Sequence, residues 1–299
     1  NNAYHGHTNT LIDLSPYKFN GKGGSGKMDY VHIADMPDGI RGRWKYSEKD
    51  WIEKYILQVK SIVDEIYRKN KKLSCFFVES ILGCGGQIIL PPNYLKEVFK
   101  IIKKRKALLI VDEVQTGFGR VGNHFWGFEE HKIIPDIVTL GKPMGNGHPI
   151  AAVVTTKKIA NKFNNGMEYF NSFGGNPVSC SIGNSVLDVI ENEKLQKNAK
   201  VIGEYFLKSL NQVKLEFPKF ISEVRGRGLF LGLDFINIKN NVPNAKLATL
   251  IINEMRQRGI LLSTDGPYHN VIKIKPPLTF NKKNVDLVCF ELKNILNNL

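Results

Sequence analysis

Two side chains that could do chemistry together stand at the ends of two apolar runs. Asp112 directly follows the run Ala107 to Val111, and Lys142 comes just after the run Ile137 to Leu140. Both runs are short, rich in branched residues and bounded by polar or turn residues, which is typical of buried strands. Ligands of open α/β sheets bind at the carboxyl ends of the strands. A carboxylate and an amine delivered to that edge form a candidate site, whereas either one alone is more often a strand end facing water.

The elements that would position these residues alternate between strand and helix. A third buried strand, Cys75 to Val78, ends in Glu79, and a further strand is predicted at Ala151 to Thr155. Apolar residues at three- and four-residue spacing predict helices between them, at Tyr46 to Lys69, Asn93 to Lys104 and Val178 to Glu191. This alternation predicts an α/β fold with a mainly parallel sheet flanked by helices.

The last part of the chain has a different pattern, which predicts a smaller α+β domain. Helices are expected near Gln196 to Glu216, Asn244 to Arg258 and Lys283 to Leu296, and strands near Gly228 to Phe235, Ile260 to Ser263 and Val271 to Ile274. A chain of 299 residues is long enough for two domains. We place the boundary near residue 185, with a large domain at 1–185 and a small C-terminal domain at 186–299.

Composition narrows the classes of partner. The net charge of +14 could attract nucleic acid or a small anionic molecule. Most of the excess is lysine scattered along the chain, which is typical of a solvated surface, so we expect no nucleic-acid binding. No apolar run reaches 18 residues, so we expect no membrane span. The four cysteines lack metal-ligand spacing, so we expect no metal site and a reducing compartment.

Two glycine-rich stretches could bind phosphate. Gly21 to Met28 nearly fits the pattern of nucleotide-binding loops, but Met28 stands where a hydroxyl must reach magnesium, and no clear buried strand precedes the loop. We interpret it as a surface loop before a strand at Tyr30 to Ile33. Asn171 to Pro177 precedes the predicted helix at Val178, where backbone amides could hold a phosphate or simply cap the helix.

Three motifs together make the chain resemble the class III aminotransferases, which are fold type I enzymes of pyridoxal phosphate (PLP). They are VDEVQTGFGR at 111–120, TLGK at 139–142 and FGGNP at 173–177. Two further stretches, GKPMGNGHP at 141–149 and KIKPP at 273–277, are similar to the alanine–glyoxylate aminotransferase-like branch. That branch contains ethanolamine-phosphate phospho-lyase and phosphohydroxylysine phospho-lyase. The resemblance covers essentially the whole chain and implies the fold of these enzymes.

The resemblance assigns the cofactor ring to five residues. Lys142 would form the Schiff base with PLP, since an amine beside a bound cofactor can lose its proton and act as a nucleophile. Asp112 would pair with the pyridine nitrogen and keep it protonated, which makes the ring an electron sink. Val114 would pack on one ring face and Tyr4 on the other. Gln115 would hydrogen-bond the phenolate oxygen.

Two other residues complete the cofactor site that the resemblance implies. Ser172 would donate to the cofactor phosphate from the neighbouring subunit, which implies a homodimer, or a homotetramer built from such dimers. His5 would line the same pocket as Tyr4. The family also carries an N-terminal segment with a Ser/Gly-rich turn that binds the PLP phosphate. We therefore expect the chain to be N-terminally truncated, to hold only part of the cofactor site and to be inactive by itself.

One departure from the family pattern bears on the substrate. The family pairs the glutamate at Glu79 with an arginine that grips the substrate carboxylate, but Lys273 stands at the arginine's position, and Leu82 stands where glutamine is common. Lysine lacks the two-pronged fork that suits a carboxylate. We therefore expect a small phosphorylated amine as substrate and a phospho-lyase reaction on phosphoethanolamine or phosphohydroxylysine.

Other functions remain open at this stage. The enzyme alternative is an alanine–glyoxylate or ω-amine aminotransferase with the same cofactor. The non-enzyme alternatives are an inactive scaffold and a basic nucleic-acid binder, which would bind DNA or RNA in a salt-sensitive way. The resemblance implies a mitochondrial location, with the cytoplasm as the alternative.

Overall fold

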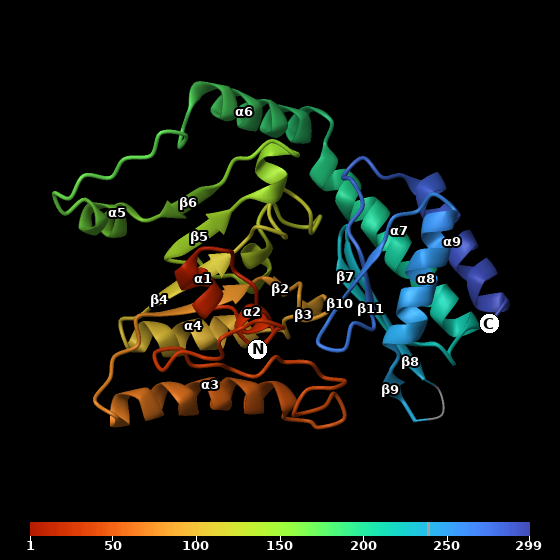
Figure 1. Cartoon of the computed structure of the whole chain (residues 1–299), viewed down its shortest axis with the longest axis horizontal. Coiled ribbons are helices and arrows are strands. Elements are labelled where there is room, and N and C mark those ends of the chain that lie inside the picture. Colours follow the sequence, from red (N-terminus) through yellow and green to blue (C-terminus); the bar gives the residue numbers. More distant parts are fainter. Residues whose placement is uncertain (238–239) are drawn as a thin grey trace.

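The described residues form two large sheets, each with its own helices, and a small two-stranded sheet. The computed structural model describes residues 1–237 and 240–299 (Figure 1). The first sheet has the strand order β1-β4-β5-β6, and the second has the order β10-β11-β8-β7, with β9 paired to β8. In the view of Figure 1 the first sheet lies on the left and the second on the right.

Three strands of the first sheet run parallel and end together. These are β1 (Cys75–Glu79), β4 (Leu108–Asp112) and β5 (Ile137–Leu140), while the edge strand β6 (Ala152–Thr155) is antiparallel to β5. Glu79 is paired with Asp112, and Asp112 with Thr139. The expected mainly parallel sheet is therefore confirmed, and the polar residues at its carboxyl edge lie on adjacent strands.

The core of this half lies between the sheet and two helices, α3 (Trp51–Arg68) and α4 (Tyr94–Lys104). Both helices carry an apolar stripe at three- and four-residue spacing. The stripes pack against Leu109 and Val111 of β4, and their buried members are Tyr55, Val59, Val63, Tyr94, Leu95, Val98 and Ile102. Each such side chain contributes roughly 1.5–3 kcal/mol when fully buried. Figure 1 shows both helices below the sheet, with α3 on the outside.

The second half is an antiparallel sheet covered by long helices. Its strands are β7 (Ile221–Arg227), β8 (Phe230–Asn237), β9 (Val242–Pro243), β10 (Ser263–Asp265) and β11 (Val271–Ile274). Its helices are α7 (Leu195–Glu216), α8 (Ala245–Gln257) and α9 (Lys282–Asn297). A second apolar cluster fills the space between sheet and helices, so this half buries a core of its own.

The remaining elements connect and frame the two halves. They are α1 (Asn9–Asp13), α2 (Pro16–Phe19), β2 (Ile81–Leu82), β3 (Ile88–Ile89), the 3₁₀ helices η1 (Gly127–His131) and η2 (Lys142–Gly145), α5 (Lys157–Phe163) and α6 (Pro177–Asn192). Residue 185 lies within α6, and the domain boundary placed there remains a prediction. No helix in the described residues is long and apolar enough to cross a membrane.

Three element predictions need correction. The strand expected at Tyr30 to Ile33 is absent: Tyr30 lies in a turn, and residues 31–33 pair with no strand of the sheets. The strand expected from Ile260 begins instead at Ser263, and Leu261 is exposed to solvent. Strand β7 was not predicted, because Glu223, Arg225 and Arg227 interrupt its apolar pattern.

A buried charge cluster joins the N-terminal segment to the second sheet. Arg41 grips the carboxylate of Asp234 with both terminal nitrogens, and Nη2 lies 2.6 Å from Oδ1. Asp234 is buried and also accepts hydrogen bonds from Ser222 Oγ at 2.7 Å and Asn270 Nδ2 at 3.0 Å. Arg225 approaches the same carboxylate at 3.4 Å. Removing one partner of a buried ion pair leaves the other charge buried and unpaired. We therefore expect this cluster to hold the two halves together.

We predict that Asp234→Asn lowers the free energy of unfolding by about 3–5 kcal/mol, because Arg41 and Arg225 would lose their shared anion. Urea unfolding followed by circular dichroism measures the change. Asp188→Asn, on the exposed face of α6, is the matched control and should shift stability by less than about 0.5 kcal/mol. A loss below 1 kcal/mol for Asp234→Asn would show that the cluster does not hold the halves together.

Candidate active site

A cavity of about 210 Å³ opens at the carboxyl edge of β1, β4 and β5. Of the nine residues selected from the sequence, seven line this cavity, namely Tyr4, His5, Glu79, Asp112, Val114, Gln115 and Lys142. The strand ends supply the charged groups, and the N-terminal segment supplies the aromatic rings. The juxtaposition of amine and carboxylate that the strand pattern suggested is therefore present at one cavity.

Asp112 is held in place at the end of β4. The backbone N–H of Val114 donates to its Oδ1 at 3.0 Å, and His5 Nδ1 lies 3.0 Å from its Oδ2, within hydrogen-bond distance. The His5 ring stacks on Phe77 at 3.9 Å between centroids. Each carboxylate oxygen can accept more than one hydrogen bond, so Asp112 keeps capacity for an N–H of a ligand in the cavity.

Lys142 has an unusual backbone at the end of β5. Its φ is +26°, which is rare for a residue other than glycine. Pro143 follows, and a residue before proline is disfavoured in the right-handed helical region. The strained conformation costs on the order of 1–3 kcal/mol and turns the chain sharply into η2. The turn leaves the Lys142 side chain exposed at the cavity rather than packed in the sheet.

Glu79 and Gln115 meet over Gly83. Glu79 is buried and accepts hydrogen bonds from the backbone N–H groups of Tyr4 at 3.2 Å and Gly83 at 2.8 Å. Burial raises the pKa of the Glu79 carboxyl, and His5 lowers it in part. A Cβ at Gly83 would lie 2.6 Å from Gln115 Nε2 and 3.2 Å from Glu79 Oε2. A side chain at position 83 would therefore displace the Gln115 amide and crowd the Glu79 carboxylate.

A second buried carboxylate, Glu113, fixes the loop that follows β4. It accepts hydrogen bonds from the hydroxyls of Ser80 and Thr116, and from the backbone N–H groups of Gly127 at 2.9 Å and Phe128 at 2.8 Å. Burial raises the pKa of Glu113, while these four donors oppose the shift. Glu113 faces away from the cavity and positions its neighbours. Its role was not singled out from the sequence.

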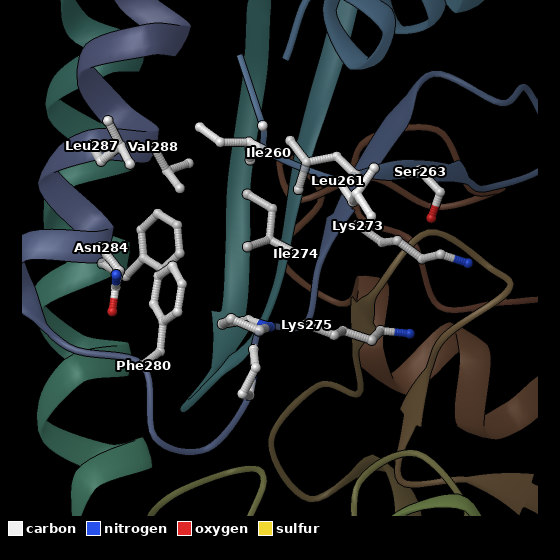
Figure 2. A pocket seen from close by; sticks show the side chains of 15 residues that line it. Ile260, Leu261, Ser263, Lys273, Ile274, Lys275, Phe280, Asn284, Leu287 and Val288 are labelled. Atoms are coloured by element: carbon white, nitrogen blue, oxygen red, sulfur yellow. The ribbon is translucent and has the colours of Figure 1, made fainter. Parts of the chain in front are cut away.

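Two of the selected residues lie outside the cavity. Ser172 is exposed in the segment between α5 and α6, which extends away from the first sheet in Figure 1. Lys273 lies in β11 and lines a separate groove of about 560 Å³, where its Nζ is 3.3 Å from Asp265 Oδ1 (Figure 2). Neither Ser172 nor Lys273 therefore lines the cavity of its own chain.

Sequence reasoning missed a residue that does reach the cavity wall. Lys275, one residue beyond β11, donates from Nζ to Gln115 Oε1 at 2.7 Å. Burial lowers the pKa of Lys275 to about 8. The strand period offered a signal, because residues two apart on a strand point to the same face and Lys275 follows Lys273 by two.

The chain belongs to the class III aminotransferases. The sequence model described as Aminotransferase class-III matches residues 1–296. The "Alanine--glyoxylate aminotransferase 2-like" protein of Drosophila melanogaster is 46% identical over 95% of the chain and 58% of its own length. The "Ethanolamine-phosphate phospho-lyase homolog 1" of Caenorhabditis elegans is 40% identical over 95% of the chain and 63% of its own length.

The fold is that of fold type I PLP enzymes. A phospholyase from Arthrobacter, solved in complex with phosphoethanolamine, superposes with a TM-score of 0.92 at 34% identity, covering 99% of the chain and 69% of that protein. The cofactor of this family is pyridoxal phosphate, as expected from the motifs. The chain spans about three fifths of the length of the curated relatives above.

The residues present fit the ring of this cofactor. Asp112 could accept a hydrogen bond from the pyridine nitrogen, Val114 would give an apolar wall beside Gly141, and Lys142 would supply the amine. Thr139, next to Asp112 in the strand register, has a buried Oγ1 without a hydrogen-bond partner among the described residues. A polar group of a ligand at this edge would satisfy it.

We predict that Asp112→Asn weakens PLP binding by about 10- to 100-fold, because an amide cannot balance the charge of a protonated pyridine nitrogen. Absorbance titration of the apoprotein with PLP measures the affinity. Asp112→Glu, which keeps the charge but moves it, should lose less. Equal affinity for wild type and Asp112→Asn would exclude Asp112 as the partner of the ring nitrogen.

Proposed function

We propose that the whole protein is a PLP-dependent phospho-lyase that acts on a small phosphorylated amine, either phosphoethanolamine or phosphohydroxylysine. The observation that carries this proposal is the kind of cation near the cavity. Lysines, and no arginine, line the cavity and the separate groove at β11 in the described part of the chain. Lysine can bind phosphate as a point charge, and without arginine the site lacks the two-pronged fork that holds a substrate carboxylate. The names of the C. elegans and Arthrobacter proteins support the same reaction.

The reaction consumes water and needs no external oxidant or reductant. Phosphoethanolamine and water give acetaldehyde, ammonium and phosphate. The C–H bond at the amino carbon breaks and its electron pair forms a C=C bond, while the C–O bond breaks and its pair leaves with phosphate. A proton then returns to the carbon that lost phosphate. Water supplies the carbonyl oxygen as ammonia leaves.

Each role in this reaction falls to a residue at the cavity. PLP, when bound, supplies an electron-withdrawing ring that stabilises negative charge at the amino carbon. Lys142 is the base that takes the proton from that carbon, and its strained backbone holds the amine at the cavity. Asp112 would hold the ring nitrogen, with His5 fixing the carboxylate from behind. Glu79 fixes Tyr4 at the cavity wall.

An aminotransferase reaction is the second candidate. The Drosophila relative carries an aminotransferase name, and the cavity residues serve either reaction. The two functions differ in co-substrate, since transamination requires a keto acid and releases no phosphate. We also propose a mitochondrial location, with the cytoplasm as alternative; a relative from Arabidopsis thaliana, 41% identical over 96% of the chain and 58% of its own length, is named a mitochondrial protein.

We predict that full-length protein with PLP releases phosphate and ammonia in equal amounts from phosphoethanolamine or phosphohydroxylysine without a keto acid. Lys142→Ala should lower the rate by at least about 100-fold, because the base is lost. Coupled assays for phosphate and ammonia measure both products. Amine transfer to glyoxylate or pyruvate with no phosphate release would establish the aminotransferase instead.

We also propose a homodimer, or a tetramer of such dimers, in which Ser172 reaches the cavity of the neighbouring subunit. The segment that carries Ser172 exposes an apolar patch, which is typical of an interaction surface. Phe170 is 77% and Phe173 is 85% exposed. Such exposure costs free energy in water unless a partner covers the rings.

We predict that the double variant Phe170→Glu/Phe173→Glu shifts the full-length protein from dimer toward monomer, because two charges would be buried at the interface. Light scattering coupled to gel filtration measures the mass. Ile134→Glu, at another strongly exposed apolar residue, is the matched control and should remain a dimer. A dimer of unchanged affinity in the double variant would place the interface elsewhere.

A further inference from the structure

Two lysines at the end of β11 point to the same side of the second sheet. Lys273 lies in the strand and Lys275 just beyond it. Figure 2 shows both amino groups directed away from the apolar side of the groove that Phe280, Leu287 and Val288 form. They point toward the first half of the chain, which carries the cavity.

The charge of Lys273 is already balanced. Its Nζ is 3.3 Å from Asp265 Oδ1, and the side-chain amide of Gln87 donates to the other oxygen of Asp265 at 2.9 Å. Lys273 and Asp265 are diagonal neighbours in the β10–β11 pair, in which Lys273 pairs with Ser263 and Asp265 with Val271. An anion that bound Lys273 would have to compete with this carboxylate.

Lys275 has no such counter-ion. Among the described residues no carboxylate lies within 4.0 Å of its Nζ, and its hydrogen-bond partner is the neutral Oε1 of Gln115 at 2.7 Å. The centroid of the Phe230 ring lies 4.2 Å from Nζ, so the ring covers another side of the ammonium group. A half-buried cation with only a neutral acceptor favours an incoming anion, because an anion would balance the charge that burial has partly desolvated.

The electrostatic surroundings agree with this geometry. Burial lowers the pKa of Lys275 to about 8, Asp265 raises it, Lys273 lowers it and Glu79 raises it. Asp265 and Glu79 therefore act on Lys275 from a distance without contacting it. Because an anion in contact would raise the pKa again, binding of phosphate would hold Lys275 in its charged form.

The position of Lys275 links it to the cavity. Its partner Gln115 lines the cavity together with Lys142 and Asp112, and Gly83 gives the Gln115 amide its place beside Glu79. The aliphatic part of Lys275 lines the groove on the other side. Lys275 therefore stands at the wall between the two hollows, where it can reach a ligand group that extends from the cavity toward the second sheet.

We propose that Lys275, more than Lys273, binds the phosphate group of the substrate and so determines specificity for phosphorylated amines. This inference rests on the proposed phospho-lyase function. The Lys275 ammonium group would exchange the Gln115 oxygen for a phosphate oxygen, or donate to both, since it has three donors. Lys273 contributes a second positive charge that its ion pair with Asp265 weakens.

The kinetic test uses full-length, PLP-loaded protein and phosphoethanolamine. Lys275→Gln should raise KM by about 10- to 100-fold, the loss expected for one charge-assisted hydrogen bond, with a smaller change in kcat. Lys275→Arg should restore KM to within a few-fold of wild type, because it keeps the charge. Lys273→Gln should raise KM less than Lys275→Gln. The exposed Lys246→Gln on α8 is the matched control and should behave as wild type.

A binding test separates this inference from the proposed function. Inorganic phosphate is titrated calorimetrically into the PLP-loaded wild type, Lys275→Gln and Lys275→Arg, with thermal unfolding to verify that each variant is folded. Weaker binding in Lys275→Gln that arginine restores supports the anion site, even if the wild type releases no phosphate and the lyase function fails. Equal KM and equal phosphate affinity in wild type and Lys275→Gln would overturn the inference while leaving the lyase function standing.

Discussion

The parallel register of β1, β4 and β5 is the constraint on which the site depends. Glu79 and Asp112 are paired in it, so two carboxylates stand side by side at one edge. Successive residues of a strand face opposite sides, so the adjacent side chains of Asp112 and Glu113 point into different surroundings. Asp112 lines the cavity, and Glu113 is buried among four donors. A register slip of one residue would bring Glu113 to the cavity in place of Asp112. It would also bury Asp112 in the core without hydrogen-bond partners.

The site also depends on how the two halves meet. One wall of the cavity comes from the first sheet, but Gln115 on that wall is held by Lys275 from the second. The buried cluster of Arg41 and Asp234 fixes the same junction from the N-terminal segment. Charged and polar contacts carry this junction, so its geometry is more specific than apolar packing alone would make it, although each contact adds little net stability.

The sequence predicted the features that depend on residues close to one another in the chain. Short runs of branched residues located β4 and β5, and Asp112 and Lys142 followed from them as strand ends. Strand β7 was not predicted because charged residues interrupt its apolar pattern, and its buried Arg225 donates to the backbone carbonyl of Gly86, 139 residues away. Lys275 escaped for the same reason, since its partner Gln115 is 160 residues away. The motif resemblance supplied the cofactor and the roles of Tyr4 and Val114, which no periodicity could have given.

The charges around the site are separated, with carboxylates on the side of the first sheet and ammonium groups on the side of the second. The first sheet brings the carboxylates of Glu79 and Asp112 to the cavity, and the second sheet brings the ammonium groups of Lys273 and Lys275 toward it. A substrate with an amino group at one end and a phosphate at the other is a dipole of matching sense. Under the proposed function, its amino group would lie beside Lys142 at the cofactor, whose ring nitrogen Asp112 would hold, and its phosphate would lie at Lys275. A simple amine without the anionic end would lose half of this orientation, so the same field that binds the substrate would also select it.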